Sequence, residues 1–270
     1  MTVARVSLLH ELFTGRLPRL VMFDLDGTLV DSVPDLAAAV DCMLVALGRE
    51  PAGVERVRLW VGNGARVLVR RALAGGLEHE HVDAALAGQA LALFMDAYAG
   101  SHALTRVYPG VVETLDRLRA QGVALALITN KPARFLPGLL ADQGLDGYFQ
   151  WLVGGDTLPQ QKPDPAALHW VMDKAGVAPG EALFVGDSRN DVRAAQAAGV
   201  TCVALSYGYN HGEPIARENP ARVIDDLREL FGTTPCPQDT RHTSRNPGER
   251  RTPQAPGDCP ASLASPGALR

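Results

Sequence analysis

An apolar segment that runs directly into two aspartates is the feature that most constrains this chain. Residues 20–23 read as a buried strand, and Asp24 and Asp26 follow it, two positions apart, before Gly27. Because a glycine breaks the regular strand, both carboxylates can converge on one spot at its end. Two convergent acids repel each other unless a cation neutralises them or one stays protonated. An ordinary turn after a strand would give the same local pattern. Other segments of the chain must therefore distinguish a catalytic pair of carboxylates from a plain turn.

Paired carboxylates of this kind support two complementary chemical tasks. An aspartate can act as a nucleophile and form a covalent phospho-aspartate. A second aspartate nearby can give and take protons as a general acid and base. The pattern therefore makes Asp24 and Asp26 candidate catalytic residues.

Short apolar runs alternate with helical patterns over much of the chain. Strand character appears at residues 20–23, 123–128, 182–185 and 201–205, and more weakly at 151–153. Helical patterns accompany the later runs, at about residues 111–121, 132–143, 164–175 and 190–198. Strands that alternate with helices predict an α/β fold, with a Rossmann-like parallel sheet covered by helices on both faces.

Residues 34–104 break this alternation and read as helix throughout. Apolar residues recur at helical spacing in three groups, which begin at Leu36, Val67 and Val82. We predict a small α-helical cap domain, inserted after the first strand and placed over its carboxylates as a lid. The hydrolase core then comprises residues 18–33 and 105–231, and residues 1–17 form an N-terminal extension.

The composition changes at residue 232. Residues 232–270 hold seven prolines and almost no large apolar side chains. Such a segment cannot bury enough apolar surface to offset the entropy lost on ordering, so we predict a disordered Pro-rich tail.

Bulk properties exclude several classes of partner. The 270-residue chain has a net charge of −4 and no basic stretch interleaved with aromatic residues, so nucleic acid is not expected. No run approaches the ~18 apolar residues of a membrane helix. The four cysteines are scattered, which suits a reducing compartment. We expect a cytoplasmic monomer or homodimer that acts on a small molecule.

Three further polar segments stand at the ends of predicted elements. Thr129 and Asn130 follow a strand and begin a helix, a natural phosphate contact, although either could simply cap the helix. Lys162 lies in a Pro-rich turn and offers a fixed positive charge. Asp187 and Asp191 flank a turn into a helix and suit Mg²⁺, although acids also cap helices. Because ligands bind at the carboxyl ends of parallel strands, we expect these segments to meet.

Together these segments resemble the haloacid dehalogenase-like hydrolase superfamily over about residues 18–231. The resemblance rests on four motifs: Asp24-x-Asp26-Gly-Thr28, then Thr129, then Lys162, and finally Gly186-Asp187-(x)₃-Asp191. The helical segment after the first motif is similar to the α-helical cap of the superfamily.

The resemblance implies a role for each residue. Asp24 is expected to be the nucleophile and a ligand of Mg²⁺, and Asp26 the acid/base, with its backbone carbonyl on the metal. Asp187 completes the metal site and Asp191 supports it. Thr129, Asn130 and Lys162 are expected to bind the phosphate.

Within the superfamily the chain most resembles the bacterial phosphoglycolate phosphatases. The likeness covers residues 24–36, and in the cap the segment Trp60-Val61-Gly62-Asn63-Gly64 with Arg70-Arg71-Ala72-Leu73. It implies Mg²⁺-dependent hydrolysis of 2-phosphoglycolate through a phospho-aspartate. Gly62, Asn63 and Arg71 are the candidate substrate-binding residues.

Other functions of the same fold stay open at this point. The cap also resembles those of amino-sugar phosphate phosphatases and of sugar phosphomutases, which return the phosphate to a sugar. A dehalogenase is disfavoured because it needs neither a second acid at Asp26 nor a metal. A non-catalytic binding module is disfavoured because all four catalytic motifs are present.

Overall fold

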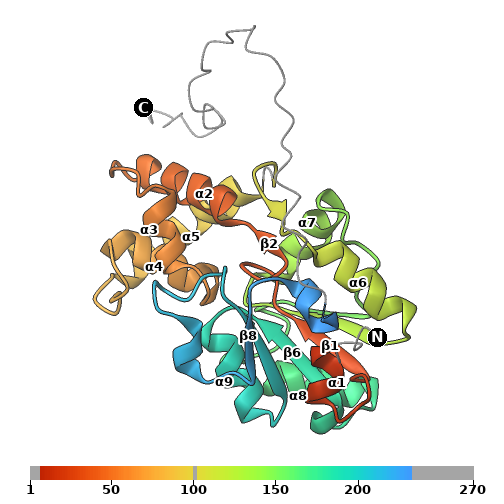
Figure 1. The fold of residues 1–270 in the computed structure, drawn as a ribbon. Helices are drawn as coiled ribbons and strands as arrows, with labels where there is room; N and C mark the ends of the chain where they lie inside the picture. Colours follow the sequence, from red (N-terminus) through yellow and green to blue (C-terminus); the bar gives the residue numbers. More distant parts are fainter. Residues whose placement is uncertain (1–6, 100–101, 233–270) are drawn as a thin grey trace, which may run out of the picture. The chain divides into compact units, whose positions relative to one another are not determined.

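A computed structural model describes residues 7–99 and 102–232 and is built around a parallel sheet (Figure 1). The sheet has the strand order β5-β4-β1-β6-β7-β8, and every neighbouring pair is parallel. The predicted fold class, an α/β Rossmann-like sheet with a helical segment after the first strand, is confirmed. The predicted tail, residues 232–270, lies almost entirely outside the described residues.

The secondary structure follows the chain in this order. The strands are β1 (Leu20–Phe23), β2 (Val30–Asp31), β3 (Arg106–Val107), β4 (Ala124–Ile128), β5 (Trp151–Val153), β6 (Ala182–Gly186), β7 (Thr201–Leu205) and β8 (Arg222–Ile224). The α-helices are α1 (Leu8–Leu12), α2 (Val33–Ala46), α3 (Val54–Trp60), α4 (Gly64–Ala74), α5 (Ala84–Tyr98), α6 (Val111–Ala120), α7 (Leu136–Asp142), α8 (Ala166–Ala175) and α9 (Arg189–Ala197). Short 3-10 helices are η1 (Ala133–Phe135), η2 (Pro179–Glu181), η3 (Ile215–Glu218) and η4 (Leu227–Phe231).

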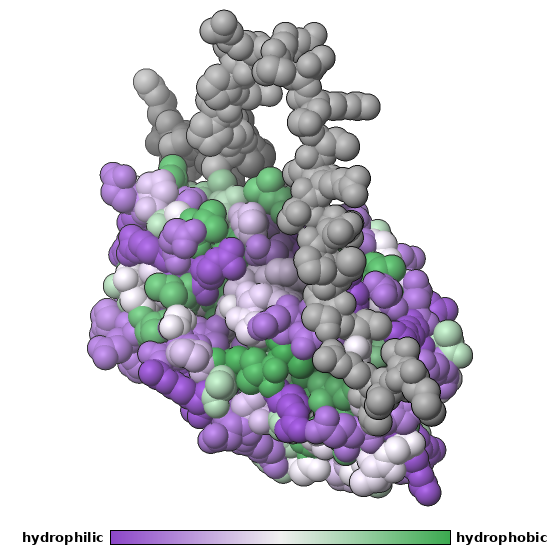
Figure 2. Space-filling view, in the orientation of Figure 1, coloured by the Kyte–Doolittle hydropathy of each residue, from purple (hydrophilic) through white to green (hydrophobic). Residues whose placement is uncertain are grey.

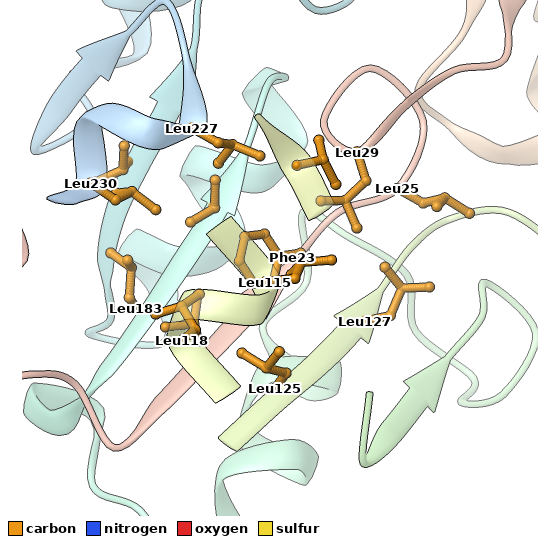
Figure 3. Close-up of a cluster of buried hydrophobic side chains, with 14 of the residues drawn as sticks. Phe23, Leu25, Leu29, Leu115, Leu118, Leu125, Leu127, Leu183, Leu227 and Leu230 are labelled. Carbon is orange, nitrogen blue, oxygen red and sulfur yellow. The ribbon is translucent and has the colours of Figure 1, made fainter. Parts of the chain in front are cut away.

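The sheet is buried on both faces, because alternate residues of each strand enter different hydrophobic clusters. In β1, Val21 and Phe23 enter one cluster, and Leu20 and Met22 enter the other. Figure 3 shows the first cluster, in which leucines of α6 and η4 pack against leucines of the strands. Helices α8 and α9 cover the opposite face. This packing fixes the sheet and therefore the positions of its strand ends.

Helices α2 to α5, here called the helical insert, have a hydrophobic cluster of their own. Figure 1 shows them grouped together, apart from the helices that flank the sheet. Val40, Val57, Val69 and Phe94, one from each helix, are almost completely buried in that cluster. The insert is thus held together largely by its own apolar side chains.

A short neck joins the helical insert to the sheet. The chain leaves through β2 and returns through β3, and these strands pair antiparallel. Beside this pair, the buried Asp35 carboxylate accepts the backbone N–H groups of Leu104 and Thr105 and the hydroxyl of Thr105. One carboxylate therefore links the outgoing and the returning segments of the neck.

Most expected elements are confirmed within one or two residues, but the structure also contains elements that were not expected. Strand β8 was not expected, because two of its three residues are exposed and carry no apolar run. The short strands β2 and β3 were also missed. In the insert, three helices were expected, whereas the described residues form four, because the short helix α3 shows only two buried residues.

No helix among residues 7–99 and 102–232 is long and apolar enough to cross a membrane. Figure 2 shows hydrophilic residues over most of the visible face, interrupted by smaller hydrophobic patches.

We expect Asp35→Ala to lower the free energy of unfolding by about 2–4 kcal/mol. The substitution leaves buried N–H and O–H donors of Leu104 and Thr105 without their charged acceptor. Asp96→Ala, which removes an exposed carboxylate of α5, serves as the control and should change stability by less than about 0.5 kcal/mol. Urea unfolding followed by circular dichroism measures both. Equal stability of the two variants would contradict the linking role.

Candidate active site

The predicted site residues gather at the carboxyl ends of three neighbouring central strands. Asp24 follows β1 and its N–H donates to the carbonyl of Val185 in β6. Thr129 follows β4, and Asp187 follows β6. Because β4, β1 and β6 are adjacent in the sheet, segments more than 100 residues apart in sequence meet at one edge.

Lys162 is the central cation of this cluster. Its ammonium lies 2.9 Å from Oδ1 of Asp24 and 2.6 Å from Oδ1 of Asp191, and it also donates to the carbonyl of Ile128. The side chain is only 2% exposed. Burial, the largest single influence, opposes the charge, but Asp191 and Asp24 together raise the pKa of Lys162 to about 12. The ammonium therefore stays charged at neutral pH.

Asp187 and Asp191 are held in place by a dense set of donors. Oδ1 of Asp187 accepts the hydroxyl of Thr28, and its Oδ2 accepts the N–H of Tyr209. Oδ2 of Asp191 accepts the N–H and the hydroxyl of Ser188. With Lys162 on its other oxygen, Asp191 is saturated by protein donors, so it is placed to orient the cluster.

Gly27 allows the loop after β1 to pass close to Asp187. Its φ is +88°, a conformation that favours glycine, and an added Cβ would lie 2.3 Å from Oδ2 of Asp187. A side chain at this position would push the carboxylate out of the cluster. The glycine of the first motif therefore has a steric reason as well as a conformational one.

The cluster carries more negative charge than Lys162 alone offsets. Ligand atoms of Asp24, Asp187 and Asp191 lie within 4.8 Å of one another, and all three residues are buried. Burial first, and the charge of Asp191 next among the influences that oppose ionisation, raise the pKa of Asp24 to about 7. Burial likewise raises the pKa of Asp187 well above its ordinary value. Three buried carboxylates with a single ammonium between them leave an excess of negative charge, which fits a divalent cation.

Asp26 forms a second ion pair, with Lys131. The ammonium of Lys131 lies 2.9 Å from Oδ1 and 3.2 Å from Oδ2 of Asp26, and Ser32 also donates its hydroxyl to Oδ1. Lys131 is 3% exposed at its side chain. Each aspartate of the first motif therefore forms an ion pair with a buried lysine, Asp24 with Lys162 and Asp26 with Lys131.

The loop before α4 is bound directly to the strand ends. The carbonyl of Gly62 accepts hydrogen bonds from the side-chain amides of Asn130, at 3.0 Å, and Asn190, at 3.1 Å. Asn130 also exchanges hydrogen bonds with the backbone of Lys162. Asn63 lies in the same contact and donates weakly to Asn190. The helical insert is therefore closed over the carboxylates in this structure.

The closed insert forms a pocket above Asp24 and Asp26. Its polar lining comes from these two aspartates, Thr129, Asn130 and Lys131 at the strand ends. Its apolar walls come mostly from the insert, with Leu36, Val61, Ala65, Leu68, Phe94 and Phe135. A small polar molecule can therefore reach Asp24 while aliphatic and aromatic groups enclose it.

The predicted cap residues occupy different positions relative to this pocket. Gly62 lines it. Asn63 and Arg71 are not among its lining residues, and the guanidinium of Arg71 donates to the carbonyl of Trp60.

Sequence reasoning did not assign Lys131 or Tyr98, both of which line the pocket. Lys131 follows Thr129 and Asn130 directly, so its place after the strand was a usable signal. Tyr98 lies at the end of α5, far in sequence from the other pocket residues that were predicted, and nothing in its neighbouring sequence indicated a place in the site.

Comparison with known proteins decides the family. The model of the haloacid dehalogenase-like hydrolase family matches residues 21–205. The chain belongs to the haloacid dehalogenase-like hydrolase family. It is 70% identical over 222 residues to a phosphoglycolate phosphatase of Pseudomonas putida, covering 82% of each chain. It is 66% identical over 231 residues to phosphoglycolate phosphatase 1 of Pseudomonas aeruginosa, covering 86% of this chain and 84% of the relative.

A solved structure extends the comparison to the fold. A predicted phosphoglycolate phosphatase from Haemophilus somnus superposes with a TM-score of 0.73 at 39% identity, over 78% of this chain and 96% of that one. With the family and these relatives, the prediction of a phosphoric monoester hydrolase is confirmed.

We expect a divalent cation to stabilise the folded protein in a pH-dependent way. With its pKa raised to about 7, Asp24 in the folded metal-free protein binds more protons than in the unfolded chain between about pH 4 and pH 7. Its contribution to stability therefore falls as the pH rises through this range. A bound cation replaces those protons, so the stabilisation by Mg²⁺ should be larger at pH 8 than at pH 5.

Thermal unfolding with excess Mg²⁺ or with chelator measures this effect. At a hundredfold excess over Kd the expected gain is about 2.7 kcal/mol, or roughly 5–10 °C in Tm at pH 8. Asp187→Asn should lose most of the gain, whereas Asp173→Asn, at an exposed carboxylate of α8, should keep it. No gain in the wild type, or the same gain at both pH values, would contradict a cation site at this cluster.

Proposed function

We propose that this protein hydrolyses 2-phosphoglycolate to glycolate and phosphate, with Asp24 as nucleophile and Mg²⁺ as cofactor. The observation that carries the proposal is the buried Asp24, 2.9 Å from Lys162 and at the floor of a small closed pocket. Relatives 66–70% identical over most of their length are named phosphoglycolate phosphatases, which supports the choice of substrate.

The reaction begins with attack of an Asp24 carboxylate oxygen on phosphorus. The P–O bond to glycolate breaks, and Asp26 gives a proton to the departing oxygen. A water molecule then attacks the phosphorus of the phospho-aspartate while Asp26 takes its proton. The bond between phosphorus and the Asp24 oxygen breaks, so phosphate leaves, Asp24 is again a carboxylate and Asp26 is again the protonated acid.

Positive charge near Asp24 lowers the barrier to this attack. Nucleophile and phosphate are both negative, and Lys162 offsets that repulsion at 2.9 Å from Asp24. Asp24, Asp187 and the backbone carbonyl of Asp26 would hold Mg²⁺, with Asp191 in support, and the ion would supply further neutralising charge. Thr129 and Asn130, between β4 and η1, would bind phosphate oxygens, Thr129 through its hydroxyl and Asn130 through its backbone N–H, because Gly62 and Lys162 occupy the Asn130 side chain.

Hydrogen bonds and closure of the helical insert position the Asp26 carboxyl for proton transfer. Lys131 and Ser32 fix the orientation of Asp26 toward the pocket. We also propose that residues 34–104 act as a cap, because the contacts of Gly62 with Asn130 and Asn190 close the pocket over both aspartates. Closure excludes bulk water and limits the length of the substrate.

A panel of phosphate esters tests the substrate directly. With Mg²⁺ we expect the highest kcat/KM on 2-phosphoglycolate, and values at least about tenfold lower on glucosamine 6-phosphate, β-glucose 1-phosphate and an aryl phosphate. The small apolar pocket leaves little room for a sugar ring. A preference for any sugar phosphate, or formation of an isomerised sugar phosphate, would contradict the proposal.

Two variants serve as controls in the same assay. Asp24→Asn should abolish turnover, because an amide is a poor nucleophile. Asp26→Asn should lose about 10²–10⁴-fold in kcat, the usual share of general acid–base catalysis. Phosphate release by Asp24→Asn at the wild-type rate would show that another group attacks phosphorus.

A further inference from the structure

The pocket gives a negatively charged substrate one favourable place for its second anionic group. Among the described residues that line it, Lys131 alone carries a positive charge. Asp24 and Asp26 would repel a carboxylate, and the apolar walls formed by Leu36 and Phe94 offer it no hydrogen bond. An unpaired carboxylate against such walls would be strongly disfavoured.

Lys131 retains the capacity to bind a further anion. An ammonium group has three N–H donors. The Lys131 ammonium donates to the two Asp26 carboxylate oxygens, at 2.9 and 3.2 Å. These two contacts use at most two of the three N–H groups, so a donor remains for a second carboxylate. The Lys131 side chain is buried and lines the pocket, so its position is fixed before a ligand enters.

Tyr98 places an unsatisfied donor beside this ammonium. Its side chain is 2% exposed and lines the pocket, and its hydroxyl lies close to the Lys131 ammonium but has no acceptor for its own proton within the described part of the chain. The Tyr98 ring centroid is 4.7 Å from Nζ of Lys131. A buried hydroxyl whose proton has no acceptor is costly, and a ligand in the pocket would supply that acceptor.

Aromatic packing fixes the position of Tyr98. Its ring stacks on Phe94 at 5.8 Å and meets Phe135 edge-on at 5.0 Å. Phe94 and Tyr98 come from α5 of the helical insert, whereas Lys131 and Phe135 come from the segment after β4. The hydroxyl and the ammonium are therefore brought together by closure of the insert.

We propose that Lys131 and Tyr98 form the subsite that binds the substrate's carboxylate, and thereby select short phosphorylated α-hydroxy acids. This inference rests on the proposed function, since it names the part of the same pocket that recognises the acid group. In phosphoglycolate a single methylene separates the carboxylate from the ester oxygen, so both ends fit one small pocket. Selectivity then arises next to the catalytic aspartates, and not from Asn63 or Arg71.

The test compares two substrates that differ only in the carboxylate. 2-Phosphoglycolate and 2-hydroxyethyl phosphate are assayed with the wild type, Lys131→Met, Lys131→Arg and Tyr98→Phe. Lys174→Met, which removes an exposed lysine of α8, is the matched control. Loss of the Asp26 ion pair in Lys131→Met slows both substrates alike, so the ratio of their kcat/KM values isolates carboxylate binding.

We expect Lys131→Met to reduce the preference for phosphoglycolate by about 10- to 100-fold, mainly through KM. Tyr98→Phe should reduce it by a smaller factor. Lys131→Arg should keep most of the preference, and Lys174→Met all of it. An equal loss for both substrates in Lys131→Met would overturn the inference and leave Lys131 as a positioning residue for Asp26.

A binding measurement separates this inference from the proposed function. In the Asp24→Asn background, calorimetry should show that Lys131→Met weakens phosphoglycolate binding by about 10- to 100-fold and barely changes that of 2-hydroxyethyl phosphate. Equal weakening of both ligands would overturn the inference. A wild type with no preference for phosphoglycolate would overturn the proposed substrate together with the inference. A preference that persists in Lys131→Met and Tyr98→Phe would overturn only the inference.

Discussion

The ion pairs of Lys162 are the interaction on which the rest of this site depends. Three buried carboxylates converge near the ends of β1 and β6, and Lys162 forms ion pairs with two of them. Removing one partner of a buried ion pair typically costs about 3–5 kcal/mol, because a charge is left without compensation. Lys162 therefore stabilises the folded protein at this cluster. The negative charge that it leaves unneutralised can still attract a divalent cation.

The fold converts this local arrangement into a usable site. Parallel strands buried on both faces bring their carboxyl ends to one edge, where the aspartates and lysines meet. The helical insert then closes over that edge through the carbonyl of Gly62 and the neck at Asp35. The strand ends of the sheet therefore supply the charged groups of the pocket, and the helical insert supplies most of its apolar walls and the hydroxyl of Tyr98.

Sequence patterns predicted the sheet well because its central strands are continuous apolar runs. They missed β8, whose residues are mostly exposed, and α3, which is too short to show a clear period. The convergence of Asp24, Lys162 and Asp187 was also predictable, since each follows or precedes an identifiable element. The pairing of Lys131 with Asp26, and the approach of Tyr98, depend on tertiary packing that one-dimensional spacing does not encode.

The stereochemical course at phosphorus tests the central claim, that Asp24 carries the phosphoryl group between substrate and water. A phosphorothioate ester made chiral at phosphorus with ¹⁶O and ¹⁸O is hydrolysed in ¹⁷O-labelled water, and the configuration of the released chiral thiophosphate is determined. Two successive in-line displacements, first by Asp24 and then by water, each invert phosphorus, so the account predicts net retention. Net inversion would show a single direct attack by water and would contradict it.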